Sequence, residues 1–308
     1  SLSACSVAPV YQVPSVATPS SFKEAGALWQ LAKPNDVIDR GPWWMLFGDE
    51  QLNQLASMVE VSNQNIAAAV AAVAQAQAAV RSEQAGLLPS VDASLGQTRQ
   101  GGNQASGKGN ASVGINAAWD VDLWGRLKGA VGAAQSNAQV SEADLAAARL
   151  SAVGSLVQNY VRLREADAEL QILRQSIEGY QRSLLITQNR YDVGVEAKTA
   201  VLQAQTTLTN TQASLEAMRQ SRQTYEHAIA VLVGQAPADF SLPAAVWVAT
   251  VPQVPVLVPS TLLERRPDIA AAERAVAVAN AQIGIAQAAY YPSLNLSGSL
   301  SRSGSNLG

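Results

Sequence analysis

The stretch IAAAVAAVAQAQAAVRSEQAGLLPSVDAS, residues 66–94, occurs twice in this chain of 308 residues. Its second copy, IAAAERAVAVANAQIGIAQAAYYPSLNLS, occupies residues 269–297, and 14 of the 29 aligned positions are identical without a gap. Several matches are alanines, but a glutamine and the Pro-Ser pair at 89–90 recur as well. The chain therefore contains a tandem duplication of a long unit. Because the chain ends soon after the second copy begins, we expect it to be a fragment of a longer protein.

Within the repeated stretch, the hydrophobic period changes from helical to extended. Apolar residues at helical spacing from Leu52 to Val80 predict one helix over about 50–87, which Pro89 ends. From Ser90 onward, apolar and polar residues alternate, and they alternate again from 113 to 121 after a glycine-rich segment. The sequence predicts a hairpin of two strands joined by a long loop at 100–110. The duplicate predicts a third strand over 293–301.

The middle of the chain predicts a long antiparallel α-hairpin. No proline occurs between Pro89 and Pro237, and the helical pattern runs from 125 to 192, where Gly194 suits a helix end. Such a helix would be ~100 Å long. Apolar residues at seven-residue intervals mark a coiled-coil seam: Leu156, Leu163, Leu170, Ile177, Leu184 and Tyr191. The returning helix, over about 197–234, carries its own seam: Val201, Leu208, Leu215, Tyr225, Ile229 and Leu232.

Composition argues against several classes of function. Only 15% of the residues are charged and the net charge is −3, so nothing supports binding to nucleic acid through its phosphates. The only histidine, His227, has no nucleophile motif near it, and no cluster of His, Cys or carboxylates has the spacing of a metal site. We therefore expect no enzyme activity, no metal and no cofactor. The longest wholly apolar stretch, 66–74, is far shorter than the ~18 residues of a membrane-spanning helix.

The amino-terminal sequence Leu2-Ser3-Ala4-Cys5 resembles a bacterial lipobox, in which the cysteine becomes the acylated first residue. On this interpretation residues 1–4 are the end of a signal peptide and the rest is exported. Ser6, rather than an aspartate, resembles the outer-membrane type of lipoprotein. The alternative is a stray cysteine in an unstructured tail.

Two further motifs, together with the duplication, identify a family. The motif WDVDLWGR, residues 119–126, lies where the second strand turns into the long helix, and LLERRPDI, residues 262–269, opens the second repeat. They resemble the outer-membrane factor family of TolC-like channels, and within it the lipoprotein subgroup that serves resistance-nodulation-division efflux pumps. The resemblance implies a mostly α-helical protein with transmembrane β-strands. Three subunits would form one twelve-stranded outer-membrane barrel and a twelve-helix tunnel in the periplasm.

The resemblance also implies a function and partners. The protein would be a passive exit duct for drugs and other small molecules, recruited by a periplasmic adaptor and an inner-membrane transporter, and anchored in the bacterial outer membrane. Two alternatives stay open: the duct of a type I polypeptide secretion system, and a periplasmic adaptor or structural coiled-coil lipoprotein. An adaptor would have a single hairpin without membrane-type strands, so the duplication argues against it.

Candidate functional residues follow from the strands, the junction and the turn between the long helices. The residues expected to face lipid are Val91, Ala93, Leu95, Val113, Ile115, Ala117, Trp119, Leu294 and Leu296. The strand-to-helix junction comprises Asp120, Asp122, Trp124, Gly125 and Arg126. Trp119 is expected at the membrane interface and Trp124 in packing at the junction, while the two aspartates either line the lumen and attract cations or merely stay hydrated.

The turn after the long helix is expected to meet the adaptor, through Gly194, Thr199, Ala200 and Gln203. Many family members have a Thr-Asp pair there, and its carboxylate helps to tie the closed tip together. This chain has Thr199-Ala200, which puts a latch in the first repeat in doubt. The gating carboxylates of the second repeat would lie beyond Gly308.

The expected organisation has seven parts. They are a signal-peptide remnant (1–4), a lipid-anchored extended segment (5–48), a first helix (49–88), a transmembrane β-hairpin (89–123), a periplasmic α-hairpin (124–234), an irregular connector (235–264) and the start of the second repeat (265–308).

Overall fold

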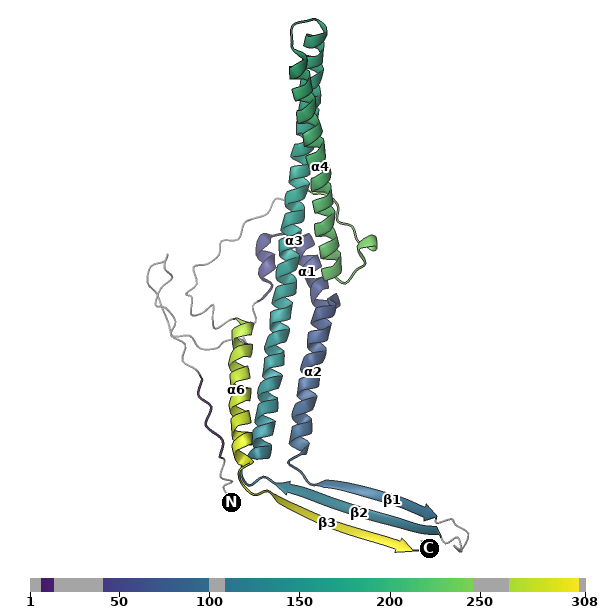
Figure 1. The fold of residues 1–308 in the computed structure, drawn as a ribbon, viewed down its shortest axis with the longest axis vertical. Helices are drawn as coiled ribbons and strands as arrows, with labels where there is room; N and C mark the ends of the chain where they lie inside the picture. The colour runs from purple at the N-terminus through teal and green to yellow at the C-terminus, as the bar shows by residue number, and fades with distance from the viewer. Residues whose placement is uncertain (1–6, 14–40, 100–108, 246–265, 305–308) are drawn as a thin grey trace. The chain divides into compact units, whose positions relative to one another are not determined.

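The computed structural model describes residues 7–13, 41–99, 109–245 and 266–304 (Figure 1). In chain order its elements are the 3-10 helix η1 (Trp43–Phe47), α1 (Glu50–Ser62), α2 (Gln64–Ala85), β1 (Ser90–Arg99), β2 (Gly109–Val121), α3 (Arg126–Asp192), α4 (Lys198–Leu232), the 3-10 helix η2 (Pro237–Asp239), α6 (Pro267–Ala288) and β3 (Leu294–Gly304). Cys5, most of the predicted 100–110 loop and the later part of the predicted connector lie outside the described residues.

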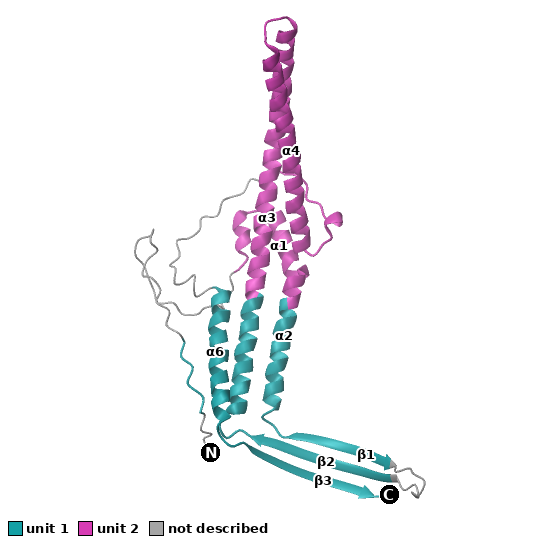
Figure 2. Cartoon of the chain, viewed as in Figure 1, with its two compact units in different colours: residues 1–36, 69–145, 257–308 teal, residues 37–68, 146–256 magenta. Residues whose placement is uncertain are grey.

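The chain divides into two compact units (Figure 2). Unit 1 comprises residues 1–36, 69–145 and 257–308, and unit 2 comprises residues 37–68 and 146–256. Helices α2 and α3 contribute residues to both units. None of the helices in the described part of the chain is both long and apolar enough to cross a membrane.

Unit 1 contains the sheet and both copies of the repeated helix. The sheet is antiparallel in the order β1-β2-β3. Helices α2 and α6 each have 22 residues, and their bounds differ by 203 positions at both ends, as the sequence duplication predicts. Pro267 occupies the first turn of α6, where a missing backbone N–H costs nothing. The side chain of Ile285 on α6 packs where Gly129 leaves room on α3, since a Cβ at position 129 would lie 3.1 Å from its Cγ1.

Unit 2 contains the predicted α-hairpin, and its core lies where η1 and α1 meet the hairpin. The largest fully buried side chains are Tyr160, Leu52, Leu156, Leu163, Ile229, Val59 and Val233. The predicted seam of α3 is buried at its first three positions, half-buried at Ile177 and Leu184, and exposed at Tyr191. The seam of α4 is likewise buried at Val201, Leu215 and Ile229 and half-buried at its other positions. Burial of the coiled coil therefore decreases along α3 toward the turn between the two helices.

The prediction of one helix over 50–87 was wrong, because Asn63 divides it. The backbone of Asn63 is extended, with φ −72° and ψ 121°. Its Oδ1 accepts hydrogen bonds from the backbone N–H groups of Asn65 (3.0 Å) and Ile66 (3.2 Å), and its Nδ2 donates to the carbonyl of Leu232 (2.9 Å). One side chain thus caps the start of α2 and ties it to the end of α4. Helix α2 also ends earlier than expected, at Ala85.

Two glycines with left-handed backbone end the hairpin helices. Gly194 has φ +77°, and the N–H of Val195 returns to the carbonyl of Arg190 (2.9 Å), as in a glycine-terminated helix. Gly234 has φ +74° and lies against Ser62, whose carbonyl oxygen would be 2.5 Å from a Cβ at position 234. Glycine is therefore required at 234 both by backbone conformation and by the close approach of α1.

Candidate functional site

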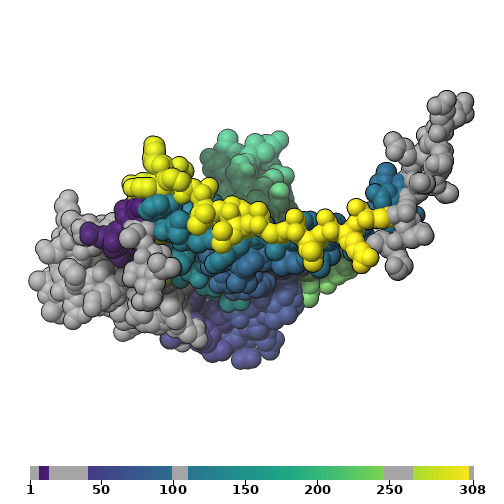
Figure 3. Space-filling view, turned by 90° about the horizontal axis from the view of Figure 1, so that it is seen from below, coloured from purple at the N-terminus to yellow at the C-terminus, as the bar shows by residue number. Residues whose placement is uncertain are grey.

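The sheet presents one mainly apolar face, which also carries Gln97 and Arg302 toward one end, and all nine residues predicted to face lipid lie on it. In the antiparallel register Val91 is opposite Ala117, and Trp119 is opposite Leu296. Because opposed residues share a face and neighbours along a strand alternate, the same face carries Ala93, Ile115, Leu95, Val113 and Leu294. In Figure 3, which views the molecule from below, β3 (yellow) lies in front of the rest of the chain. That this face contacts lipid stays a prediction.

The opposite face of the sheet is polar. It is formed by short side chains: Ser90, Asp92, Ser94, Thr98, Asn110, Ser112, Asn116, Asp120, Asn295, Ser297, Ser299, Ser301 and Ser303, with Gly96, Gly114 and Ala118 between them. The hydroxyls of Ser94 and Ser112 donate to carbonyls across the β1–β2 ladder, at 3.4 Å each. The sheet thus separates an apolar surface from a surface that water can solvate.

Two tryptophans at the strand-to-helix junction form hydrogen bonds to the two turns in which a copy of the repeated helix leads into a strand. The indole N–H of Trp119 donates to the carbonyl of Leu87 (3.1 Å), in the turn that precedes β1. The indole N–H of Trp124 donates to the carbonyl of Pro292 (2.9 Å), in the corresponding turn before β3, and its ring stacks on Tyr291 with centroids 4.7 Å apart. Trp124 thus packs against the turn before β3 at the junction. The side chain of Trp119 is 39% exposed. Its place at a membrane interface stays a prediction.

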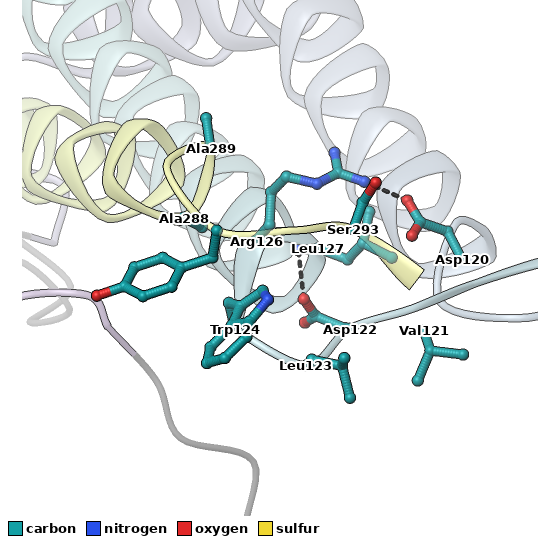
Figure 4. A pocket seen from close by; sticks show the side chains of 11 residues that line it. Asp120, Val121, Asp122, Leu123, Trp124, Arg126, Leu127, Ala288, Ala289 and Ser293 are labelled. Carbon is teal, nitrogen blue, oxygen red and sulfur yellow. Dashed lines mark hydrogen bonds and ion pairs between the residues drawn. The ribbon is translucent and has the colours of Figure 1, made fainter. Parts of the chain in front are cut away.

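The two junction aspartates have structural partners that neither sequence-based alternative included (Figure 4). Asp120 forms an ion pair with Arg126 of α3. Asp122 accepts hydrogen bonds from the backbone N–H groups of Leu127 (3.1 Å) and Lys128 (2.9 Å), so its carboxylate caps the first turn of α3. Gly125, with φ +83°, makes the turn between strand and helix.

A pocket of about 230 Å³ opens at this junction (Figure 4). Its lining combines the Asp120–Arg126 pair with Trp124, Leu127 and Ser293. The carboxylates that line it already accept bonds from Arg126 and from the helix start. The arrangement is that of a rigid corner between a strand and a helix.

Unit 2 contains a buried ionic network that sequence reasoning missed. Asp167, on α3, accepts from Arg222 Nε on α4 (2.6 Å), from Arg164 Nη1 (3.0 Å) and from the backbone N–H of Ala245 (3.3 Å). Arg164 also donates to the carbonyl of Pro243 (2.9 Å) and to the side chain of Gln51 on α1. The side chains of Arg164 and Asp167 are only 2% and 3% exposed. The network joins α1, α3, α4 and the segment after η2.

The same network extends to the start of α1. The hydroxyl of Tyr160 donates to Asp49 Oδ2 (2.7 Å), while Asp49 Oδ1 caps α1 by accepting from Leu52 N–H (3.1 Å). Arg164 lies over the Tyr160 ring, 4.9 Å from its centroid. Burial, and then the hydrogen bond to Asp49, raise the pKa of Tyr160 to about 12. Little signal for this network was present in the sequence, because residues 164 and 167 lie among other charged residues, Arg162, Glu165 and Glu169.

The structure brings the four predicted tip residues to one end of the α-hairpin. Gly194, Thr199 and Gln203 are exposed and Ala200 is half-buried. Val193 and Val195 beside them are 73% and 66% exposed. Contact of this tip with an adaptor stays a prediction. His227 is exposed on α4, and in the described ranges no group of three or more His, Cys, Asp or Glu residues could hold a metal ion.

Comparisons with known proteins agree on one family. The model of the outer membrane efflux protein family matches residues 55–235 and 258–308. The chain is 30% identical to the pyoverdine export outer membrane protein OpmQ of Pseudomonas aeruginosa over 99% of its length and 66% of that protein's. It is also 30% identical to the cation efflux system protein CusC of Escherichia coli K12, over 99% of this chain and 67% of CusC. The chain thus spans about two thirds of the length of these relatives.

Solved structures give the same result for the fold. A crystal structure of CusC superposes with a TM-score of 0.82 at 28% identity, covering 98% of this chain and 68% of CusC. The outer-membrane channel OprN superposes with a TM-score of 0.79 at 28% identity, covering 95% of this chain and 66% of OprN. Given its duplicated helices, its two-faced sheet and these matches, the chain belongs to the outer membrane efflux protein family.

Proposed function

We propose that this protein is the outer-membrane channel of a tripartite efflux pump, a passive duct from the periplasm to the exterior. The observation that carries the proposal is the sheet, which has an exposed apolar face, a polar face, and β1 and β3 at its outer edges. Backbone groups at an open edge cannot be satisfied in lipid, so the sheet must close with further strands. We infer that the further strands come from the rest of the protein and from other copies of it, in a homotrimer.

The cargo we propose is small solutes. The named relatives export pyoverdine or are assigned to cation efflux, and a relative from Pseudomonas putida is named for toluene efflux. These names span quite different chemistries. We infer that specificity lies with the pump that loads the duct, and that the duct offers a polar wall formed by the serine- and asparagine-rich face of the sheet. No catalysis and no cofactor are part of this proposal.

The partners we propose are a periplasmic adaptor and an inner-membrane transporter. The exposed end of the α-hairpin around Gly194 and Gln203 would meet the adaptor, and acylation of Cys5 would add a lipid anchor in the outer membrane. The rival proposal of a periplasmic adaptor would leave the sheet's apolar face without a role. A duct for polypeptide secretion would share the fold, and transport assays with small molecules distinguish it.

The proposal is tested by placing one charge on either face of β2 in the full-length protein. Arginine on the lipid face of a membrane strand costs about 2–4 kcal/mol near the bilayer midplane, whereas a lumen-facing arginine is tolerated. Ile115→Arg should therefore prevent assembly in the outer membrane and sensitise cells to exported compounds. The matched variant Asn116→Arg, one residue away on the polar face, should still assemble and should alter conductance in planar bilayers.

His227→Ala should leave resistance unchanged, because no catalytic step is involved. Equal assembly of the Ile115→Arg and Asn116→Arg variants would show that the apolar face does not meet lipid. A wild-type trimer that assembles in the outer membrane but restores no resistance to cells lacking the channel would exclude an efflux duct.

A further inference from the structure

Residues 7–13 of unit 1 run beside α6 and contact it at three positions. The hydroxyl of Tyr11 donates to the carboxylate of Glu273 (2.9 Å) and contacts its backbone carbonyl (3.2 Å). Asn280 donates from Nδ2 to the carbonyl of Pro9 (3.2 Å), and Ala8 lies against Gly284. Positions 273, 280 and 284 are separated by seven and four residues, so they share one face of the helix. The segment runs antiparallel to α6 along that face.

The duplication supplies an internal comparison for this contact. The three positions of α2 that correspond to 273, 280 and 284 hold Val70, Gln77 and Arg81. All three contact positions therefore differ between the repeats, whereas 14 of the 29 aligned positions are identical. In α2 these three residues are exposed, whereas their counterparts on α6 are half-buried or buried beneath residues 7–13.

We propose that α6 carries a binding site for the chain's own residues 7–13, and that these three differences from α2 make the second repeat, and not the first, accept the segment. We call residues 7–13 the amino-terminal strap. The proposal rests on contacts within unit 1 and holds whether or not Cys5 is acylated and whatever the channel exports.

Gly284 is the steric part of the site. A Cβ at position 284 would lie 2.5 Å from Ala8 Cβ and 3.0 Å from Ala8 Cα, closer than non-bonded carbons approach. The arginine found at the corresponding position of α2 would fill the space of the strap altogether. Glycine is a poor helix former, so its presence inside α6 is explained by this close approach rather than by the helix.

Glu273 is the polar part of the site. A phenol hydroxyl bonded to an ionised carboxylate is a charge-assisted hydrogen bond, stronger than one between neutral groups. Burial, followed by the hydrogen bond to Glu273, raises the pKa of Tyr11, so the hydroxyl remains a donor at neutral pH. Valine at this position, as in α2, could accept no such bond.

The strap also reaches the strand-to-helix junction. The backbone N–H of Val7 lies 3.5 Å from the carbonyl of Trp124, and the ring of Trp124 stacks on Tyr291 just after α6. The strap therefore spans α6 from Glu273 to the junction. It fastens the first helix of the second repeat to the start of the chain.

Cleavage by chymotrypsin after Tyr11 in the full-length, detergent-purified protein measures whether the strap is docked. Cleavage of a segment that opens and closes rapidly follows the population of its open form. Gly284→Ala and Glu273→Val should each accelerate cleavage at least roughly tenfold, the effect expected from losing close packing or one charge-assisted hydrogen bond. Gly284→Arg, which copies α2, should give the same or faster cleavage.

Gly132→Ala on α3 is the matched control. It brings the same gain in helix propensity, but its Cβ would meet nothing within 4 Å, so the cleavage rate should stay within about twofold of wild type. Thermal unfolding identifies any variant that fails to fold. If Gly284→Arg fails to fold, the cleavage rate of Gly284→Ala tests the steric part of the site. If Gly284→Ala and Gly132→Ala are cleaved at the same rate, or Glu273→Val at the wild-type rate, the strap site does not exist.

Discussion

Replacing Asp167 by asparagine should strongly destabilise unit 2, although the two side chains have nearly the same shape. The carboxylate of Asp167 accepts hydrogen bonds from Arg164, Arg222 and the backbone of Ala245. An amide has one acceptor oxygen instead of two and turns its NH₂ group toward one set of these donors. The substitution also leaves Arg164, whose side chain is 2% exposed, without its counter-charge.

The expected cost is large because both partners are buried. Removing one member of a buried ion pair typically costs about 3–5 kcal/mol, most of it from the charge left behind. Replacing both members by apolar residues of similar size is often close to neutral. The double variant Arg164→Met, Asp167→Leu should therefore be more stable than Asp167→Asn by at least about 1 kcal/mol. This holds even though the Pro243 carbonyl and the Ala245 N–H lose a partner, because Arg222 keeps its ion pair with Glu226.

The measurement is guanidinium unfolding, followed by circular dichroism, at one protein concentration in one detergent, since the stability of an oligomer depends on concentration. Glu216→Gln is the control, because Glu216 pairs with Arg219 on the same hairpin but the two side chains are 65% and 47% exposed. Its cost should be below about 1 kcal/mol. The reasoning fails if Asp167→Asn costs no more than Glu216→Gln, or if the double variant is less stable than the single one.

Three further predictions concern single side chains. Asp122→Ala should lower the free energy of unfolding by about 1 kcal/mol, because α3 loses its helix cap. Asp120→Ala should lower it by less, because the ion pair with Arg126 is partly exposed. Urea unfolding of the two variants measures both effects. The pKa of Tyr160 is raised from 10.0 to about 12 in the folded state. Between these two pH values the folded state keeps the phenol proton, whereas the unfolded state loses it. The stability of wild type relative to Tyr160→Phe should therefore be constant below pH 10 and fall by up to about 3 kcal/mol as the pH rises through 12. A difference independent of pH would contradict this. Gly234→Ala should lower the thermal unfolding temperature by several degrees or more, because an alanine at φ +74° is strained and its Cβ would contact the Ser62 carbonyl. An unchanged unfolding temperature would contradict this close approach.

The elements of the fold could be predicted from the sequence because they depend on local period and on repetition. The duplicated stretch predicted two helix-to-strand units, and α2 and α6 have equivalent bounds. Alternation along 91–95 and 113–121 placed the apolar residues on one face, and the observed register agrees. Proline-free, heptad-patterned sequence predicted α3 and α4 to within two residues.

Contacts between distant residues could not be predicted, since no local pattern encodes them. Asn63 ends α1 because its side chain finds the carbonyl of Leu232, 169 positions away. Asp120 and Asp122 were interpreted from their charge alone, whereas the structure uses them to begin α3. Arg164 and Asp167 were not singled out in the sequence, because only the return of α4 brings Arg222 to the same carboxylate.

Short neutral side chains cover the polar face of the sheet, and in the described strands only Asp92 and Asp120 add a charge to it. Asp120 is already neutralised by Arg126. If this face lines the duct, as we propose, its hydroxyl and small amide groups would offer a solute many weak and interchangeable hydrogen bonds and no single strong binding site. Conduction is fastest when binding along the path is weak and distributed. Such a wall would let one channel conduct chemically unrelated solutes without binding any of them tightly. Substrate specificity would then lie with the transporter that loads the channel.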